Sequence, residues 1–320
     1  MTAPPVIARI PGSLSRAAVT ARVYRHDVKH ALRVHCASKM KKAGPLVLAG
    51  IVLAAAGAAV ASTLLQRRQD ALFHSQALGG TLHYEVYLPA DYATSGKRYP
   101  VVYFLHGLPS TGAAYRSVGF VETALDEVGR PAILVVPQGA RTDDPDPEYL
   151  DQGRGRGWDT AIADELPRVV DGRFRTIRSR RGRALVGVSA GGYGAMHLAL
   201  EHLEEFAVVE SWSGYFHPTD PTGTKPLDLG STARNTSADV HRQAIAAGSR
   251  LKRLPTFIAF YVGRDDWRFS AENEQLNQEL SRAGIPHVFR LYAGGHDQRL
   301  WQRYAPAWLS LALSHLAPAQ

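Results

Sequence analysis

The strongest constraint on the fold is a series of short apolar runs that alternates with segments of helical periodicity. Seven runs rich in Val, Ile, Tyr or Phe are predicted to be strands: Thr81–Leu88, Tyr99–Leu105, Ala132–Pro137, Ala184–Val188, Ala207–Trp212, Thr256–Val262 and His287–Tyr292. Helices are predicted at Gly119–Val128, Thr160–Val170, Gly191–His202, Ala271–Ala283 and Arg299–Leu316. Because strands separated by helices favour βαβ units, we predict an α/β fold with a mostly parallel sheet flanked by helices, in one domain over residues 78–318.

Two long segments interrupt this alternation. Gln138–Gly157 is acidic and then rich in glycine and arginine, and Gly214–Arg253 separates two predicted strands. Loops of this length in a compact domain usually serve a function or are mobile, and solvated connections are the alternative for both. The acids of the first segment suggest a calcium site, but their pattern lacks the glycine and glutamate of an EF-hand loop.

The net charge of +8 belongs to the N-terminal part of the chain. Residues 1–61 hold nine Lys or Arg and one acidic residue, whereas residues 62–320 hold 28 residues of each sign. The basic balance therefore gives no reason to expect a nucleic-acid partner for the globular part. The single cysteine, Cys36, also precedes the predicted domain, which excludes a disulfide framework, a cysteine-based zinc site and a catalytic thiol from it.

An uncharged apolar stretch, Gly44–Leu65, precedes the predicted domain. Its 22 residues are enough to cross a hydrocarbon core of about 30 Å as a helix. We expect either an uncleaved membrane anchor or the apolar region of a signal peptide cleaved after Ala59-Val60-Ala61. The positive charges before it predict that residues 1–43 stay in the cytoplasm and that the later part is exported. Alternatively, residues 1–43 belong to a misassigned start, with Met40 in place of Met1; residues 66–77 are expected to be a connector.

The stretch ALVGVSAGGYGAM contains the pattern G-x-S-x-G, with Ser189 between Gly187 and Gly191. In a nucleophile elbow the serine projects from a sharp turn between a strand and a helix, and close packing leaves no room for side chains two residues to either side. The predicted strand and helix stand where this interpretation requires them. The helix N-terminus would supply N–H groups and a partial positive charge for an oxyanion. The patterns of phosphate-binding loops are missing from this stretch, which argues against nucleotide binding.

A serine hydroxyl needs a base and an orienting carboxylate to act as a nucleophile. Asp265 and Asp266 follow one predicted strand, and His296 follows the last one. Of the thirteen histidines, His296 alone has the position expected for a base. These loops lie at the carboxyl ends of parallel strands, where open α/β sheets bind ligands. We therefore predict Ser189 as nucleophile, His296 as base and one of the two aspartates as acid, while Asp297 is expected to begin the last helix.

A second donor to the oxyanion is expected from the loop that follows the strand Tyr99–Leu105. That loop begins His106-Gly107-Leu108, and the glycine lets the backbone turn so that the next N–H faces the serine. The N–H groups of Leu108 and Ala190 are the predicted pair. His106 is predicted to be structural, since a second base has no task in this mechanism.

The segments YFLHGLPSTG, GWDTAIADELPRVVDGRF, ALVGVSAGGYGAMHLAL, YVGRDDW and GGHDQRLW, in this order, resemble the putative-esterase family of α/β-hydrolases over about residues 80–317. That family includes feruloyl and acetylxylan esterases, formylglutathione hydrolases and mycolyltransferases. The resemblance implies an α/β-hydrolase fold, points to Asp266 rather than Asp265 as the acid, and maps the oxyanion donors onto Leu108 and Ala190. The mycolyltransferases use glutamate as acid and lack the second glycine after the nucleophile, so Asp266 and Gly191-Gly192 favour hydrolysis over mycolyl transfer.

These observations lead us to expect an exported or membrane-anchored serine esterase that acts on a small-molecule or cell-envelope ester. We expect it to use no metal or cofactor and to bind no nucleic acid; the membrane would be a partner through residues 44–65 if they are uncleaved. Transfer of the acyl group to a sugar or lipid hydroxyl is the alternative. A non-catalytic surface-binding module on a hydrolase scaffold is a third hypothesis, from a different class.

Overall fold

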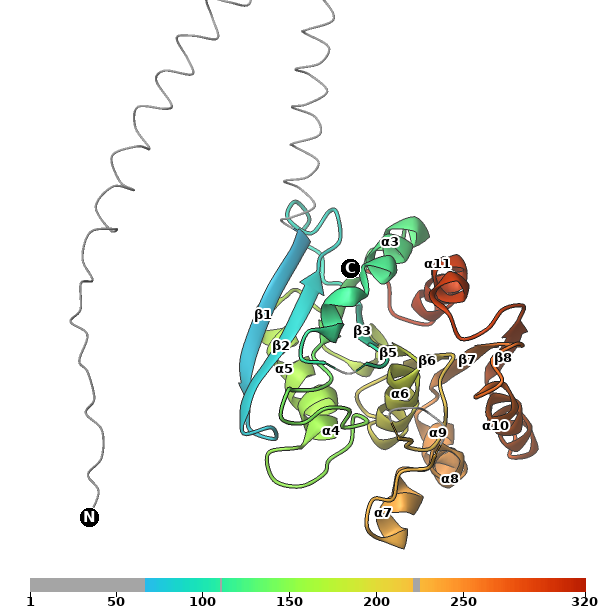
Figure 1. Cartoon of the computed structure of the whole chain (residues 1–320). Coiled ribbons are helices and arrows are strands. Elements are labelled where there is room, and N and C mark those ends of the chain that lie inside the picture. The colour runs from blue at the N-terminus through green and yellow to red at the C-terminus, as the bar shows by residue number, and fades with distance from the viewer. Residues whose placement is uncertain (1–66, 110, 221–224) are drawn as a thin grey trace, which may run out of the picture. The chain divides into compact units, whose positions relative to one another are not determined.

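An eight-stranded, mostly parallel sheet forms the centre of the computed structural model, which describes residues 67–109, 111–220 and 225–320 (Figure 1). The strand order is β1-β2-β4-β3-β5-β6-β7-β8. β1 pairs antiparallel with β2 and β2 with β4, and the other neighbouring strands are parallel. The strands are β1 Arg68–Ser75, β2 Gly80–Tyr87, β3 Val101–Leu105, β4 Ile133–Pro137, β5 Arg183–Val188, β6 Val208–Trp212, β7 Phe257–Gly263 and β8 Val288–Tyr292.

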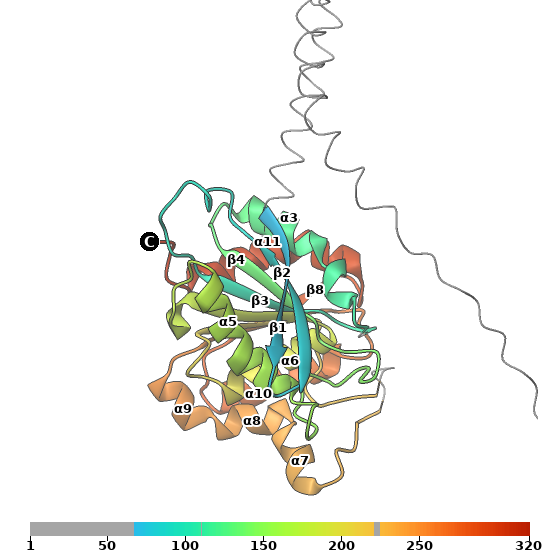
Figure 2. The same ribbon diagram turned by 90° about the vertical axis from the view of Figure 1, so that its left-hand side faces the viewer.

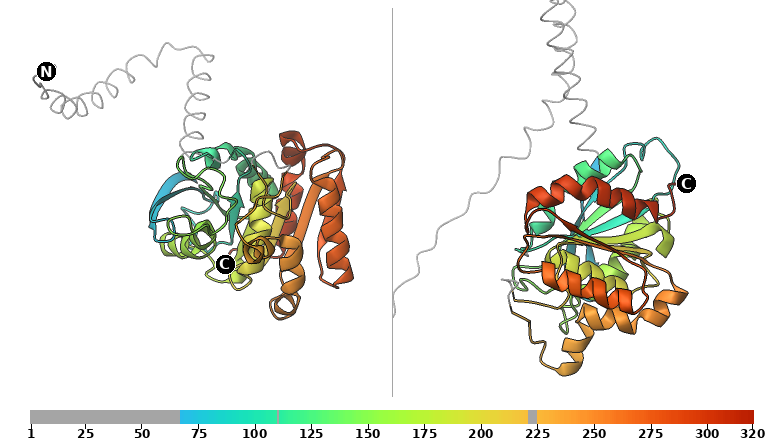
Figure 3. Two further views of the ribbon diagram at one scale, coloured as in Figure 1. Left: turned by 60° about the horizontal axis from the view of Figure 1, so that its bottom comes forward. Right: turned by 90° about the vertical axis from the view of Figure 1, so that its right-hand side faces the viewer.

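Helices cover both faces of this sheet. α3 and α11 pack on one face, and α5, α6, α8 and α10 contribute to the core on the other (Figure 2). Figure 3 shows α11 and α10 on opposite sides of the last strands. The helices are α3 Gly119–Val128, α4 Trp158–Thr160, α5 Leu166–Arg173, α6 Ala190–Glu201, α7 Thr232–Ser237, α8 Val240–Ala246, α9 Gly248–Arg253, α10 Ser270–Arg282 and α11 Gln298–Ser314.

The strands β3 and β4 are apolar throughout because both of their faces are covered. In β3, Tyr103 and Leu105 belong to the apolar core under α5 and α6, whereas Val102 and Phe104 belong to the core under α3 and α11. Strands buried on both sides read as continuous apolar runs rather than as an alternating pattern. This explains why the sequence identifies them so clearly.

The predicted α/β fold with a mostly parallel sheet is confirmed. All seven predicted strands are present, with ends shifted by no more than two residues. The predicted helix Thr160–Val170 lies within a longer helical stretch, Trp158–Arg173, which contains a π-helical turn at Ala161–Glu165. The other predicted helices also match to within two residues.

Two expectations need correction, and a third falls outside the described residues. The expected connector 66–77 holds an edge strand, β1, in which only Phe73 and Ser75 are buried. The segment Gly214–Arg253 is not a plain loop, since it contains α7, α8 and α9. The predicted apolar helix 44–65 lies outside the described residues. Within the ranges that are described, no helix combines the length and apolar character needed to cross a membrane.

Candidate active site

Ser189 occupies the turn between β5 and α6 in a backbone conformation that few residues other than glycine adopt. Its φ is 56° and its ψ is −121°. A Cβ atom on Gly187 would lie 2.0 Å from the carbonyl oxygen of Gly191, and one on Gly191 would lie 2.0 Å from that of Leu105. Both glycines are therefore required by direct contact between main-chain segments, which hold the serine at the end of the strand.

Ser189, His296 and Asp266 are joined by two hydrogen bonds at the carboxyl ends of β5, β8 and β7. Ser189 Oγ lies 2.9 Å from His296 Nε2, and His296 Nδ1 lies 2.7 Å from Asp266 Oδ2. Asp266 is only 2% exposed. When Nδ1–H donates to this carboxylate, Nε2 is left to accept the proton of the serine hydroxyl. The structure thus brings together the three residues that the sequence places on separate loops.

Aromatic side chains fix the orientation of the His296 ring. Phe269 and Trp301 each meet it edge to face, with ring centroids 5.2 Å away. The indole N–H of Trp301 donates a hydrogen bond to Ser213 Oγ at 2.9 Å, which holds the indole itself in place. Packing of this kind keeps the imidazole aligned with the serine before any substrate binds.

The other two aspartates beside these residues have different partners. Asp265 is exposed, and its backbone N–H donates to the carbonyl oxygen of Gly294 at 2.9 Å. Asp297 caps α11 by accepting hydrogen bonds from the N–H groups of Arg299 and Leu300. Of the three aspartates, Asp266 is therefore the one whose carboxylate contacts His296.

The N–H groups of Leu108 and Ala190 are both available beside the serine. Ala190 is the first residue of α6, so its N–H has no acceptor within the helix. The loop that carries Leu108 passes so close to the serine that a Cβ on Gly107 would lie 2.9 Å from Ser189 Cβ. Neither N–H donates a hydrogen bond to another described residue. Two main-chain donors at this point can receive a developing oxyanion.

His106 connects two loops through both of its ring nitrogens. Nδ1 donates to the carbonyl oxygen of Gly107 at 2.9 Å, and Nε2 accepts from the N–H of Gly139 at 3.1 Å. Burial lowers the pKa of the imidazole, which is consistent with the neutral form that these two bonds require. The hydroxyl of Tyr149 donates to the His106 carbonyl oxygen at 2.7 Å. With these partners His106 fixes the position of the loop after β3 and has no free nitrogen to act as a base.

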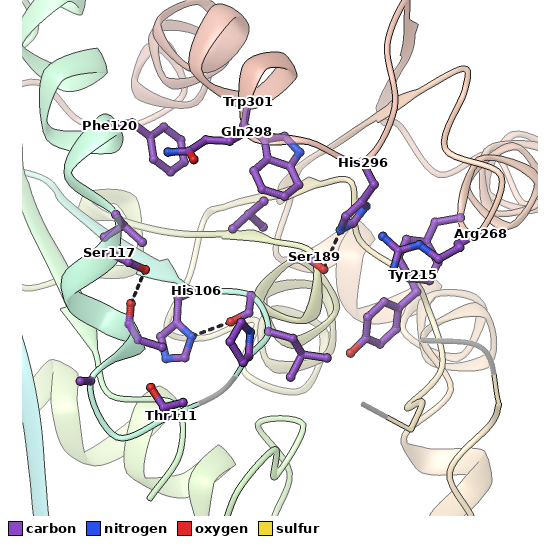
Figure 4. A pocket seen from close by; sticks show the side chains of 18 residues that line it. His106, Thr111, Ser117, Phe120, Ser189, Tyr215, Arg268, His296, Gln298 and Trp301 are labelled. Carbon is purple, nitrogen blue, oxygen red and sulfur yellow. Dashed lines mark hydrogen bonds between the residues drawn. The ribbon is translucent and has the colours of Figure 1, made fainter. Parts of the chain in front are cut away.

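A pocket of about 620 Å³ contains Ser189 and His296. In Figure 4, Phe120, Gln298 and Trp301 lie on one side of Ser189, while Tyr215 and Arg268 lie on the other. The remaining lining residues are His106, Gly107, Leu108, Pro109, Thr111, Ala113, Ala114, Ser117, Val118, Val188 and Phe269. The lining is mostly apolar, as is usual for small-molecule sites.

The acidic segment contributes a buried carboxyl group that the sequence did not reveal. Glu148 is 2% exposed and accepts a hydrogen bond from the hydroxyl of Tyr215 at 2.7 Å. Burial, together with the nearby charge of Asp146, raises the pKa of Glu148 to about 8. The carboxyl group is therefore mostly neutral at pH 7, where it supports Tyr215 in the wall of the pocket.

The segment Gly214–Arg253 is tied to α10 by a carboxylate with two histidine partners. Glu272 Oε1 lies 2.6 Å from His217 Nδ1 and 3.5 Å from His241 Nε2. It also accepts a hydrogen bond from the N–H of Phe216 at 2.9 Å. Burial alone would raise the pKa of Glu272, but the hydrogen bonds from the histidines outweigh it and hold the pKa at about 2.

Several acids of the segment Gln138–Gly157 bind side chains of the protein itself. Asp144 accepts hydrogen bonds from Arg156 and from the indole of Trp158, and Asp151 accepts one from the hydroxyl of Thr160. Across the described ranges, no group of three or more His, Cys, Asp or Glu is arranged to hold a metal ion.

The comparisons with known proteins agree with this geometry. The model of the family described as Putative esterase matches residues 75–307. An esterase of Mycobacterium tuberculosis is 29% identical over 252 residues, which cover 70% of this chain and 54% of that protein, so the chain spans about half the length of this relative.

Two solved structures share the fold. A ferulic acid esterase has a TM-score of 0.66 at 22% identity, with 78% of this chain and 97% of that chain covered. An S-formylglutathione hydrolase of Agrobacterium tumefaciens has a TM-score of 0.64 at 20% identity, with 78% and 95% covered. The family model extends from β1 into α11 and so includes every strand end around the pocket. The chain belongs to the putative-esterase family.

Proposed function

We propose that this protein is a serine esterase that cleaves carboxylic esters through an acyl-enzyme. The observation that supports it most directly is the hydrogen-bonded series from Ser189 through His296 to the buried Asp266, which opens into an apolar pocket. Membership of an esterase family supports the same reaction class. Fold alone would not, since one fold hosts many activities.

In the first half of the reaction Ser189 Oγ attacks the ester carbonyl carbon while its proton passes to His296 Nε2. Asp266 holds the imidazole in the required tautomer and stabilises the imidazolium. The carbonyl oxygen becomes an oxyanion between the N–H groups of Leu108 and Ala190. When the tetrahedral intermediate collapses, the carbon–oxygen bond to the alcohol breaks, and His296 returns the proton to the departing oxygen.

In the second half a water molecule takes the place of the alcohol. His296 removes its proton, the resulting hydroxide attacks the acyl carbon, and the free acid leaves as the proton returns to Ser189 Oγ. Loss of one oxyanion donor in a serine hydrolase costs about 3 kcal/mol of transition-state stabilisation. Both proposed donors are backbone N–H groups, so any residue other than proline at positions 108 and 190 keeps them.

Labelling with a fluorophosphonate tests the proposal, because the reagent reacts with a serine only when a base activates it. We expect the wild-type protein to be labelled and Ser189→Ala to remain unlabelled. Ser117→Ala is the matched control: Ser117 lines the same pocket, but its hydroxyl donates to the Ala114 carbonyl oxygen and has no histidine partner. Wild-type protein that stays unlabelled would favour the non-catalytic binding module instead.

Product analysis separates hydrolysis from acyl transfer. An ester is incubated with increasing amounts of a sugar or a long-chain alcohol, and free acid and new ester are quantified. We expect free acid to remain the main product at every acceptor concentration. A new ester that grows in proportion to the acceptor, at the expense of free acid, would assign transfer to a hydroxyl group instead.

We further propose that the domain acts outside the cytoplasm on a small-molecule or cell-envelope ester. The uncharged stretch Gly44–Leu65 and the basic residues before it support this proposal. Fractionation of cells that express the full chain tests it: we expect activity in the membrane fraction for an anchor, or in the medium for a cleaved signal peptide. Activity confined to the cytosol would contradict both forms of export.

A further inference from the structure

The pocket carries a permanent charge that the proposed reaction does not use. Of the described residues that line it, Arg268 alone is permanently charged, and no Asp or Glu is among them. Arg268 is half-buried and stands two residues after Asp266, on the loop that follows β7. A guanidinium partly withdrawn from water gains free energy from an anionic partner, and this pocket offers none of its own.

Among the described residues, the guanidinium makes an aromatic contact but no hydrogen bond or ion pair. Its Cζ lies 4.9 Å from the centroid of the Phe269 ring, over the ring face. A phenyl ring offers no conventional hydrogen-bond acceptor, so this contact leaves the five N–H groups of the guanidinium without an acceptor. Among the described residues, no acidic side chain pairs with it. The arrangement holds the cation in place and keeps its fork of donors available to a carboxylate.

Arg268 lies on the side of the pocket where the departing alcohol must be. The Phe269 ring on which it stacks also meets the His296 ring edge to face at 5.2 Å. His296 Nε2 gives its proton to the departing oxygen, so the alcohol portion of the ester must approach the imidazole. Figure 4 shows Arg268 on the His296 side of Ser189, opposite Phe120.

The opposite side of the pocket suits a neutral acyl group. Its walls include Phe120, and the side chain of Gln298 is uncharged. A charged acyl group would lose its hydration there without an ionic partner, whereas an apolar one would gain from burial. The two sides of the pocket thus differ in the substrate portion that each can stabilise.

We propose that Arg268 is a specificity residue that binds a carboxylate on the alcohol portion of the substrate. The preferred substrate is then an ester of a neutral acid with an anionic alcohol. The carboxylate accepts the paired N–H groups of Arg268 while the ester carbonyl lies at Ser189. This inference rests on the proposed esterase function and names the class of substrate that the same site prefers.

A pair of matched esters tests the proposal. 4-Acetoxybenzoate carries the carboxylate on its alcohol portion, and 4-acetoxybenzamide has nearly the same shape without the charge. We expect the wild-type kcat/KM to favour the benzoate by about tenfold or more, which is the ratio expected for a hydrogen-bonded ion pair. In Arg268→Gln the ratio should fall to about one, and in Arg268→Glu it should invert by electrostatic repulsion.

Arg264→Gln is the control for loss of a positive charge from the same loop. Arg264 is exposed and does not line the pocket, so we expect the ratio to stay at its wild-type value. Thermal unfolding of Arg268→Gln shows whether the loop is intact, because a purely structural role would lower the melting temperature and reduce both rates together. A wild-type ratio near one, or a ratio that Arg268→Gln leaves unchanged, overturns the proposal.

A second pair of esters tests the side of the pocket. 4-Nitrophenyl hydrogen succinate carries its carboxylate on the acyl portion, and 4-nitrophenyl butyrate is its neutral counterpart. We expect Arg268→Gln to leave the ratio of the two kcat/KM values unchanged for this pair. If the substitution lowers the ratio for this pair but not for the first one, the assignment of Arg268 to the alcohol side is overturned. Absence of turnover with every ester and of fluorophosphonate labelling would instead contradict the proposed function itself.

Discussion

The turn that carries Ser189 and the two long segments beside the pocket are held in place by different kinds of contact. In the turn, main-chain segments pack so closely that a Cβ on Gly187 or on Gly191 would lie 2.0 Å from a carbonyl oxygen. The segments 138–157 and 214–253 are instead held by ionisable side chains, the buried Glu148 and the partly buried Glu272. The position of Ser189 therefore depends on steric fit, whereas the walls of the pocket depend on the protonation states of carboxyl groups.

The two segments also differ from each other. Glu148 is neutral at pH 7 because burial raises its pKa to about 8. Glu272 is ionised because hydrogen bonds from two histidines overcome the effect of burial and hold its pKa at about 2. One segment is thus anchored by a protonated carboxyl group and the other by charged hydrogen bonds, so acid and alkali should affect them differently.

The largest expected effect is a loss of kcat from a substitution at the strand ends beside Ser189. In Asp266→Asn the amide cannot hold His296 in the tautomer that accepts the serine proton, and kcat should fall by about 10⁴. Because the carboxylate is buried and an amide has the same shape, the pocket should keep its form. The kcat of the purified variant on a neutral aryl ester provides the measurement.

Asp265→Asn is the matched control for this change. Its side chain is exposed, and the structure shows no contact between its carboxylate and His296. We expect kcat to stay within about threefold of wild type, since exposed substitutions rarely cost more than about 0.5 kcal/mol. A loss at Asp265 as large as that at Asp266 would show that the acid has been assigned to the wrong residue.

The close main-chain contact at the turn can be tested by adding a single methyl group. In Gly191→Ala the new Cβ meets the Leu105 carbonyl oxygen at 2.0 Å, so β3 and α6 must separate. We expect the free energy of unfolding to fall by about 3 kcal/mol or more. Urea denaturation measures it.

Gly172→Ala adds the same methyl group where there is room for it. Gly172 lies in α5, and outside its own stretch of helix backbone nothing comes within 4 Å of the Cβ position. Alanine is the better helix former, so this variant should gain about 0.5–1 kcal/mol. If the two substitutions had equal effects, the close main-chain contact at the turn would not be what holds it.

The features that could be predicted from the sequence depend on local or steric rules. Strands such as β3 and β4 are apolar because they are buried on both faces, and Gly187 and Gly191 reflect close main-chain contacts at the turn. The order of the serine, the acid and the histidine follows from where strands end. Such features leave a pattern along the chain that does not require knowledge of distant contacts.

The features that escaped prediction depend on partners far away in the sequence. β1 is exposed and polar over most of its length, and its strand structure comes from pairing with β2. The short helix α7 has no buried residue, and α8 is secured by His241 against Glu279, 38 residues later. Glu148 lies in a strongly acidic stretch, whose composition predicts exposure to solvent. It is buried nevertheless, and its partner Tyr215 lies 67 residues later.

Of the two carboxyl groups that hold the segments in place, the ionised Glu272 should contribute more to stability than Glu148. Glu272→Gln replaces charged hydrogen bonds to His217 and His241 with neutral ones, and we expect a loss of about 2 kcal/mol near pH 6. The pKa of Glu272 is depressed, so its contribution is present above its ordinary value of 4.5 and is lost as the pH falls through about 2. The pKa values of the two histidines are raised, so their contribution is present below 6.5 and is lost as the pH rises through the higher values in the folded state.

The difference in the free energy of unfolding between wild type and Glu272→Gln should therefore be largest at about pH 5–6 and become smaller at lower and at higher pH. Denaturation in urea across this range provides the curve. Glu274→Gln, an exposed position on the same helix, should change stability by no more than about 0.5 kcal/mol at any pH. A difference that does not vary with pH would mean that Glu272 contributes through packing rather than through its charge.

The smallest effect near pH 5 is expected at Glu148, and it should grow in the alkaline direction. Glutamine can still accept the hydrogen bond from Tyr215, so Glu148→Gln should lie within about 1 kcal/mol of wild type at pH 5. The pKa of Glu148 is raised, so the stability that its protonated form contributes is fully present below 4.5 and is lost as the pH rises through about 8. Glutamine does not titrate, so by pH 9 the variant should be the more stable protein.

Glu127→Gln, exposed on α3, is the control: its free energy of unfolding should change with pH in parallel with that of the wild type. Parallel curves for Glu148→Gln as well would show that Glu148 is ionised in the folded protein, and the contrast between the two segments would then disappear.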